Sequence, residues 1–253
     1  MEAQKAVRPK EAKKALRLAG SGDCEALRGM VLAAAAGTET LAVPAPIIVC
    51  ADADGCQPLH RAAAAGHVCV VRYLLASAVD PDCRKSKSKT PLHEAAAAGR
   101  TEVIGLLLAA GALISAHKTN GWTPLMYSCA AGDTGGATLL LTHGANLRDR
   151  NRDGQTGFYL ACREGHRRLA EQLLAPSTPL PPSGNTPYVL PKDEVPLAEP
   201  EPLLAMRTRN MKTALHGAAS NGHTSVLQML LSHGADAEAT GKSFTLFVYS
   251  LLY

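Results

Sequence analysis

Aromatic side chains, membrane-length apolar runs and paired cysteine motifs are scarce or missing in this sequence of 253 residues. Aromatic residues make up only 4% of the chain, while hydrophobic residues make up 46%. A core built mainly from alanine and leucine favours closely packed helices. Two apolar segments, AVPAPIIVCA (42–51) and FTLFVYSLLY (244–253), are shorter than the ~20 residues that a membrane-spanning helix needs. The N-terminus is charged and has no apolar signal segment, so we expect no export.

Neither cysteine pairing nor a strong charge of one sign points to a function. The seven cysteines are odd in number and none forms a C-x-x-C pair. This is typical of reduced thiols, and we expect a cytoplasmic protein that also has access to the nucleus. The formal net charge is +4 and the pI is 8.7, below the value of about 9 expected of a dedicated nucleic-acid-binding domain. The sequence also lacks the phosphate-binding pattern G-x-x-x-x-G-K-[ST].

The main positive feature is an internal repeat. Gly66, Gly99, Gly132 and Gly165 are spaced 33 residues apart, and each follows a run that is rich in small residues. Similar words surround them: QPLHRAAAAGHVCVVRYLL (57–75), TPLHEAAAAGRTEVIGLLL (90–108), TPLMYSCAAGDTGGATLLL (123–141), TGFYLACREGHRRLAEQLL (156–174), a later copy TALHGAASNGHTSVLQMLL (213–231) and a weaker one at 15–32. One such unit cannot bury its apolar faces alone, so the units are expected to stack.

These words resemble the ankyrin repeat in their period and in the motifs T-P-L-H, A-A-x-x-G-H and L-L-x-x-G-A. The resemblance implies an all-α repeat fold, an ankyrin solenoid of about six stacked helix–turn–helix units with β-turn fingers. It also implies that the imidazoles of His60, His93 and His216 join neighbouring repeats through hydrogen bonds.

Local chemistry fits the same arrangement. Thr90, Thr123 and Thr213 are predicted to cap the first helix of their repeats, because a threonine hydroxyl accepts a hydrogen bond from an unpaired amide. The glycine of each A-A-x-x-G word is predicted to end that helix in a left-handed conformation.

The register predicts the organisation of the chain. It gives a degenerate N-terminal capping repeat (1–37), a long loop (38–53), four repeats (54–175), a proline-rich acidic insertion that we expect to be disordered (176–208), a further repeat (209–240) and an irregular apolar tail (241–253). We interpret the tail as a truncated repeat, with a poorly formed first helix as the alternative.

Cys162, Glu164 and His166 lie within five positions and have the side chains of a catalytic or metal site. The repeat offers a structural interpretation instead, because Cys162 occupies an alanine position and His166 follows the helix-ending glycine. A buried thiol has a raised pKa and reacts poorly. We therefore predict no enzyme activity, no catalytic residues, no cofactor, no metal and no small-molecule ligand.

In ankyrin proteins, finger tips and first helices form the concave partner site. The residues that we predict to bind a partner are Arg61, Lys87, Lys89, Glu94, Lys118, Asn120, Trp122, Tyr127, Arg150, Arg152, Arg163 and Glu164. Trp122 is the only tryptophan, and packing against the adjacent finger is its alternative role. A basic ridge along the fingers favours an acidic protein surface, and RNA less strongly.

The predicted function is that of a non-enzymatic adaptor, with a protein partner, no membrane contact and little tendency to bind nucleic acid. Within the family, KTNGWTPLMYSC (118–129) and NRDGQTGFYLACREGH (151–166) are similar to a member associated with alanyl-tRNA synthetase, which implies that enzyme as a partner. The alternative is a basic ankyrin module that acts on tRNA or on an aminoacyl-tRNA synthetase complex.

Overall fold

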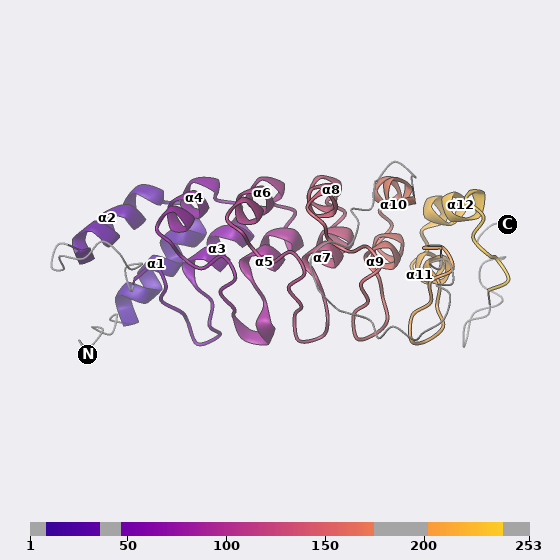
Figure 1. The fold of residues 1–253 in the computed structure, drawn as a ribbon, viewed down its shortest axis with the longest axis horizontal. Coiled ribbons are helices and arrows are strands. Elements are labelled where there is room, and N and C mark those ends of the chain that lie inside the picture. The colour runs from indigo at the N-terminus through magenta and orange to yellow at the C-terminus, as the bar shows by residue number, and fades with distance from the viewer. Residues whose placement is uncertain (1–8, 36–46, 175–201, 240–253) are drawn as a thin grey trace, which may run out of the picture. The chain divides into compact units, whose positions relative to one another are not determined.

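The computed structural model describes residues 9–35, 47–174 and 202–239 (Figure 1). These residues contain twelve α-helices, one 3₁₀ helix and no extended strand. They belong to two compact parts of the chain, unit 1 (residues 1–119) and unit 2 (residues 120–253).

Unit 1 contains three helix pairs, and its fingers project from one side of the helices (Figure 1). The first helices form one row, in which α3 packs between α1 and α5, while α4 packs between α2 and α6 in the second row. The elements are α1 (Pro9–Ser21), α2 (Cys24–Ala35), α3 (Pro58–Ala65), α4 (Val68–Ala76), the 3₁₀ helix η1 (Ser86–Ser88), α5 (Pro91–Ala97) and α6 (Thr101–Ala109).

Unit 2 repeats this arrangement with three further helix pairs. Its first helices also form a row, in which α9 packs between α7 and α11, and α10 packs against α12. The elements are α7 (Pro124–Ala131), α8 (Thr134–Thr142), α9 (Gly157–Arg163), α10 (Arg167–Leu174), α11 (Ala214–Ser220) and α12 (Thr224–Ser232).

A threonine–histidine box starts α5 and α11. The imidazole Nδ1 of His93 lies 2.9 Å from the Thr90 hydroxyl and accepts a hydrogen bond from the Thr90 amide at 3.3 Å. Thr213 and His216 repeat these contacts at 2.8 and 3.3 Å. Each box satisfies main-chain groups that the helix itself leaves unpaired.

The first helices α7 and α9 lack this histidine, and their threonines cap the helix directly. The Thr123 hydroxyl accepts from the Met126 amide at 3.4 Å, and the Thr156 hydroxyl accepts from the Tyr159 amide at 3.2 Å. In α7 and α9, Met126 and Tyr159 occupy the position that holds histidine in α5 and α11.

Glycine follows each first helix where the chain turns back. The φ angles of these residues range from +62° to +87°, in the left-handed region that glycine adopts at little cost, at Gly22, Gly66, Gly99, Gly132, Gly165 and Gly222.

The residue after such a glycine reaches back to the preceding repeat. In unit 1, His67 Nε2 lies 2.9 Å from the carbonyl oxygen of Gly20. Arg100 Nε donates to the carbonyl of Ala64 at 3.3 Å. These bonds satisfy carbonyls near the ends of α1 and α3, so adjacent repeats are joined by polar contacts as well as by packing.

Alanine and leucine fill the core, and two cysteines take alanine positions in it. Leu59, Ala62, Ala63 and Leu74 are fully buried in unit 1. Cys129 and Cys162, one repeat apart, are likewise fully buried in unit 2. Burial raises the pKa of the Cys129 thiol to about 12, and it raises the pKa of Cys162 as well.

Two described segments bear on the predicted boundaries. Ile47 and Ile48, at the end of the predicted loop 38–53, are buried. Residues 202–208, at the end of the predicted insertion, form a turn at 203–205 and the start of the finger before α11, where Met206 and Thr208 are buried. The rest of the predicted insertion and the predicted tail (241–253) lie outside the described residues.

Candidate partner-binding surface

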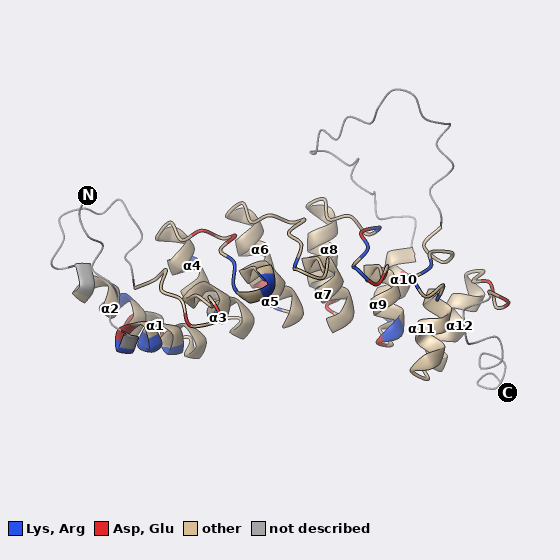
Figure 2. Ribbon diagram, turned by 90° about the horizontal axis from the view of Figure 1, so that it is seen from below, with Lys and Arg blue, Asp and Glu red and all other residues tan. Residues whose placement is uncertain are grey.

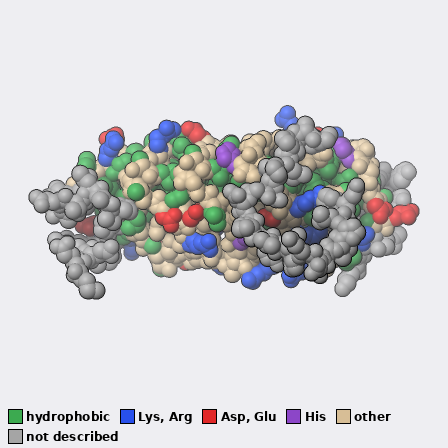
Figure 3. All heavy atoms as spheres, in the orientation of Figure 1, with side chains coloured by type: hydrophobic (Ala, Val, Ile, Leu, Met, Phe, Trp, Pro, Cys, Tyr) green, Lys and Arg blue, Asp and Glu red, His purple; other side chains and the backbone are tan. Residues whose placement is uncertain are grey.

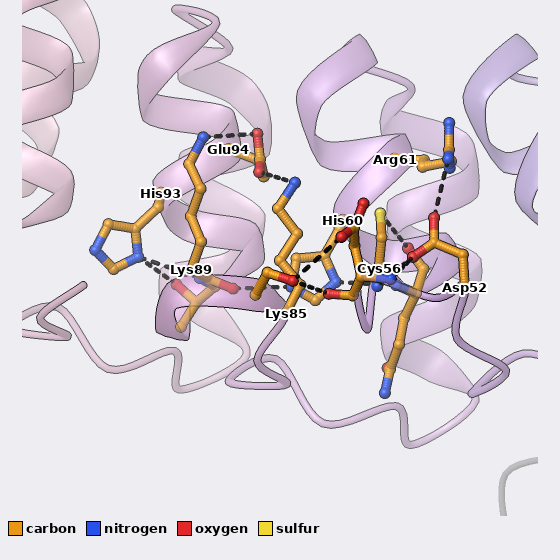
Figure 4. Close-up of polar contacts among 12 residues, drawn as sticks. Asp52, Cys56, His60, Arg61, Lys85, Lys89, His93 and Glu94 are labelled. Carbon is orange, nitrogen blue, oxygen red and sulfur yellow. Dashed lines mark hydrogen bonds and ion pairs between the residues drawn. The ribbon is translucent and has the colours of Figure 1, made fainter. Parts of the chain in front are cut away.

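Successive fingers of unit 1 are joined through His60 at the first turn of α3. Its Nδ1 accepts a hydrogen bond from the Gln57 amide at 3.3 Å, so the proton sits on Nε2, which donates to the carbonyl of Lys89 at 3.1 Å (Figure 4). The Cys83 thiol lies 3.8 Å from the same Nδ1. Burial lowers the pKa of His60 and keeps the ring neutral.

Glu94, which the sequence places on the partner surface, is buried in an ion-pair network instead. Its side chain is 11% exposed, and its two oxygens lie 2.5 Å from Lys85 Nζ and 3.0 Å from Lys89 Nζ (Figure 4). Burial raises the pKa of Glu94, but hydrogen bonds from the two lysines outweigh that effect, and the net pKa is below its usual value. Glu94 and Lys89 therefore hold a finger against α5, which corrects the prediction that Glu94 faces a partner.

Arg61 and Lys87 are exposed, while Lys118 is half-buried. The Arg61 guanidinium donates to Asp52 at 3.1 Å, and Asp52 also accepts from two amides of its own finger (Figure 4). Acidic and basic side chains thus lie near one another on the visible face of unit 1 (Figure 3). This pairing reduces the net field that unit 1 presents to a partner.

Unit 2 holds an aromatic pair against a buried cluster. The rings of Trp122 and Tyr127 lie 4.8 Å apart between centroids, inclined at 47°. Trp122 packs against a cluster formed by Met126, Tyr159 and Leu160, and both rings of the pair are half-buried. The tryptophan therefore contacts the protein on one side and keeps an accessible remainder on the other.

Arginine-bearing fingers lie next to this pair. The amide of Arg152 donates to the carbonyl of Asn120 at 3.0 Å, which joins the finger of Trp122 to the finger of Arg152. Arg150 donates from Nη1 to the carbonyl of Arg207 in the following finger at 2.8 Å. Asn120, Arg150 and Arg152 are exposed, and basic residues mark the fingers before α5, α9 and α11 (Figure 2).

Comparison with family models identifies the fold. A model described as ankyrin repeats in three copies matches residues 19–118 and 110–180, and a single ankyrin repeat model matches residues 210–242. The chain belongs to the ankyrin repeat family. A search of curated proteins finds no match. The predicted all-α ankyrin fold is thereby confirmed, and ankyrin repeats in general mediate protein–protein interaction.

The trio of Cys162, Glu164 and His166 supports the ankyrin scaffold. Cys162 is fully buried, and His166 Nε2 lies 3.0 Å from the carbonyl of Ala130 in the preceding repeat. Glu164 is exposed, and its carboxylate accepts hydrogen bonds from Nε and Nη2 of Arg163 at 2.8 and 2.5 Å. The three groups therefore make separate contacts, and Arg163 and Glu164 partly neutralise each other.

Sequence reasoning missed Tyr159, which supports the aromatic pair. A Cβ added at Gly217 of the next ankyrin repeat would meet the Tyr159 ring at 3.1 Å and the Arg163 Cβ at 3.4 Å. Gly217 thus leaves room for that ring between α9 and α11. The available signal was a tyrosine where other copies have histidine. Leu160 and Gly217, which lie next to this ring, are buried as well.

Within the described ranges, no helix is both long and apolar enough to cross a membrane. The same residues contain no group of three or more His, Cys, Asp or Glu side chains placed to hold a metal ion.

Proposed function

We propose that this ankyrin repeat protein is a non-enzymatic adaptor that binds an acidic protein partner through the fingers and first helices of unit 2. The observation that carries the proposal is the Trp122–Tyr127 pair, held at 4.8 Å on the cluster of Met126, Tyr159 and Leu160. An aromatic ring already fixed by packing loses little conformational freedom when a partner covers it. Tryptophan, tyrosine and arginine are also the side chains that most often dominate interface energies.

Charge supports an acidic partner over a neutral one. Arg150 and Arg152 are exposed in a finger that touches the finger of Trp122. Arginine offers planar donors that fit carboxylates in pairs. A partner that places an apolar side chain on the aromatic pair and carboxylates beside it would match this surface.

The direct test is quantitative affinity capture from a cytosolic extract. Wild-type protein is compared with Trp122→Ala, with Arg152→Glu and with the control Arg168→Glu, which changes an exposed arginine on the second-row helix α10. We expect one set of captured proteins to be lost at least tenfold with the first two variants and retained by the control. Equal recovery with all four proteins would contradict the proposal, provided that their melting temperatures agree.

The identity of the partner and the compartment in which it is bound are proposals of the same kind. Alanyl-tRNA synthetase is the partner to titrate first, with and without tRNA, and the cytoplasm with access to the nucleus is the compartment to examine. Binding to tRNA alone would fall steeply with salt, because phosphate contacts release counterions. If capture disappears after ribonuclease treatment, the partner is a nucleic acid and the protein-adaptor proposal is wrong.

A further inference from the structure

Two thiols from successive repeats meet at the surface of unit 1. Cys24 is the first residue of α2 and Cys69 is the second residue of α4. The Cys24 sulfur lies 3.7 Å from the carbonyl oxygen of Cys69, and the Cys69 sulfur lies 3.9 Å from the carbonyl oxygen of Gly22. The Cys24 sulfur therefore lies next to the main chain of Cys69, and the Cys69 sulfur lies next to the main chain two residues before Cys24. The two cysteines are 45 residues apart in sequence.

The two thiols also interact electrostatically. The pKa of Cys24 is raised by burial, and next by the charge of Cys69 and a hydrogen bond to it. Both cysteines are free, and a disulfide between them requires the two sulfurs to turn from these carbonyls towards each other.

Solvent reaches this pair, unlike the core cysteines. Cys69 is exposed, Cys24 is half-buried, and a shallow hollow of about 600 Å³ between the helices is lined by both thiols. Arg28 lies at its edge, with its guanidinium 5.5 Å from the centre of the Tyr73 ring, and its charge acts to lower the pKa of Cys24. A small oxidant can therefore reach both thiols.

We propose that Cys24 and Cys69 are a redox-active pair that hydrogen peroxide converts into a disulfide, which fastens the N-terminal repeat to the next one. The Cys69 thiolate attacks one peroxide oxygen, the O–O bond breaks, and a sulfenic acid and water form. The Cys24 thiolate then attacks the Cys69 sulfur, the S–S bond forms, the S–O bond breaks and hydroxide leaves as water. Two thiols and one peroxide give one disulfide and two water molecules, with two electrons passed to the oxidant.

The consequence lies in the stability of the first two helix pairs. Neighbouring repeats can open locally, and a covalent link between α2 and α4 restricts that opening, because it closes a loop of the unfolded chain. The inference concerns unit 1 and does not depend on the partner surface proposed for unit 2.

Peptide mapping of the full chain tests the link. Trypsin releases Cys24 in residues 18–28 and Cys69 in residues 62–72, each the only cysteine of its peptide. After treatment with a few equivalents of peroxide, we expect these two peptides to be joined without reductant and separate with it, in protein that runs as a monomer on a non-reducing gel. Free or singly oxidised peptides, a link to another cysteine, or a covalent dimer would overturn the proposal.

Thermal unfolding provides the second readout. Oxidised wild type should melt about 5 °C above the reduced protein, while Cys69→Ser should show no such difference. Cys50→Ser is the matched control, because Cys50 is also a half-buried thiol of unit 1 and should leave the shift intact. The proposed link would be contradicted if the rise in melting temperature persisted in Cys69→Ser. It would also be contradicted if a disulfide-linked wild type showed no such rise.

Discussion

His60 Nε2 donates a hydrogen bond to the carbonyl of Lys89, 3.1 Å away in the next finger. The same ring accepts from the Gln57 amide through Nδ1, so a single neutral imidazole joins its own helix start to the following repeat. Protonation of Nδ1 would remove that acceptor. The stability of the array is therefore linked to the charge state of this histidine.

Stability should fall as the pH drops below about 6.5, the ordinary pKa of histidine. Burial lowers the pKa of His60 and of His216, so the unfolded chain takes up protons first and acid favours unfolding. The contribution is present above pH 6.5 and is lost between that value and the lowered pKa of the folded state. Urea unfolding at pH 8 and pH 5.5 measures the change.

The histidine variants identify the source of this pH dependence. His60→Gln should lower the urea midpoint at pH 8 and flatten its change between pH 8 and pH 5.5. His117→Gln alters an exposed histidine and should leave both unchanged. A pH profile that is identical in His60→Gln and wild type would show that this imidazole is not a source of the acid sensitivity.

Glu94→Gln should destabilise the protein by about 1–2 kcal/mol, because it removes the charge that two lysines share in a largely buried position. The lysines keep some contact with water, which limits the loss. The exposed control Glu164→Gln should change stability by less than about 0.5 kcal/mol. Folded Glu94→Gln should capture partners as wild type does. A loss of capture in folded Glu94→Gln would restore this residue to the partner surface.

Ser128→Ala should stabilise the protein by about 1 kcal/mol. The Ser128 side chain is fully buried and its hydroxyl has no hydrogen-bond partner within the described residues. Ala62, Ala95 and Ala161 occupy the same position in other repeats. The hydroxyl of Ser220, by contrast, donates to main-chain carbonyls, so Ser220→Ala should bring no gain. Chemical denaturation compares the two, and a destabilised Ser128→Ala would mean that this hydroxyl is satisfied.

Alkylation should distinguish surface from core thiols. Iodoacetamide at pH 7.5 should modify Cys69 within minutes and leave Cys129 and Cys162 unmodified until the protein unfolds, because both core thiols are fully buried with raised pKa values. Mass spectrometry of the tryptic peptides follows each site. Rapid labelling of Cys162 in folded protein would require an accessible thiol and reopen a chemical role for it.

The sequence predicted the elements that depend on a repeated position. Thr90 caps the start of the first helix α5, and Gly66 ends the first helix α3 in a left-handed turn. Both were predictable because capping and left-handed turns favour those residue types locally. The family models find ankyrin repeats over 19–180 and 210–242.

Contacts between repeats were harder to predict from the sequence. Glu94 was predicted to bind a partner, and only the fold brings Lys85 and Lys89 to it. Cys24 and Cys69 occupy positions one residue apart in the repeat register, so the period did not align them. The start of the finger at residue 202 was not predicted, because its proline-rich neighbours placed it in the predicted insertion.

The central claim is that a partner covers the Trp122 side of unit 2. Because Trp122 is the only tryptophan, 5-fluorotryptophan labelling gives one fluorine resonance that reports on this surface alone. Addition of the captured partner should shift or broaden that resonance, with no change when Arg152→Glu protein is mixed with the same partner. A saturated complex in which the Trp122 resonance keeps its position and width would contradict the account.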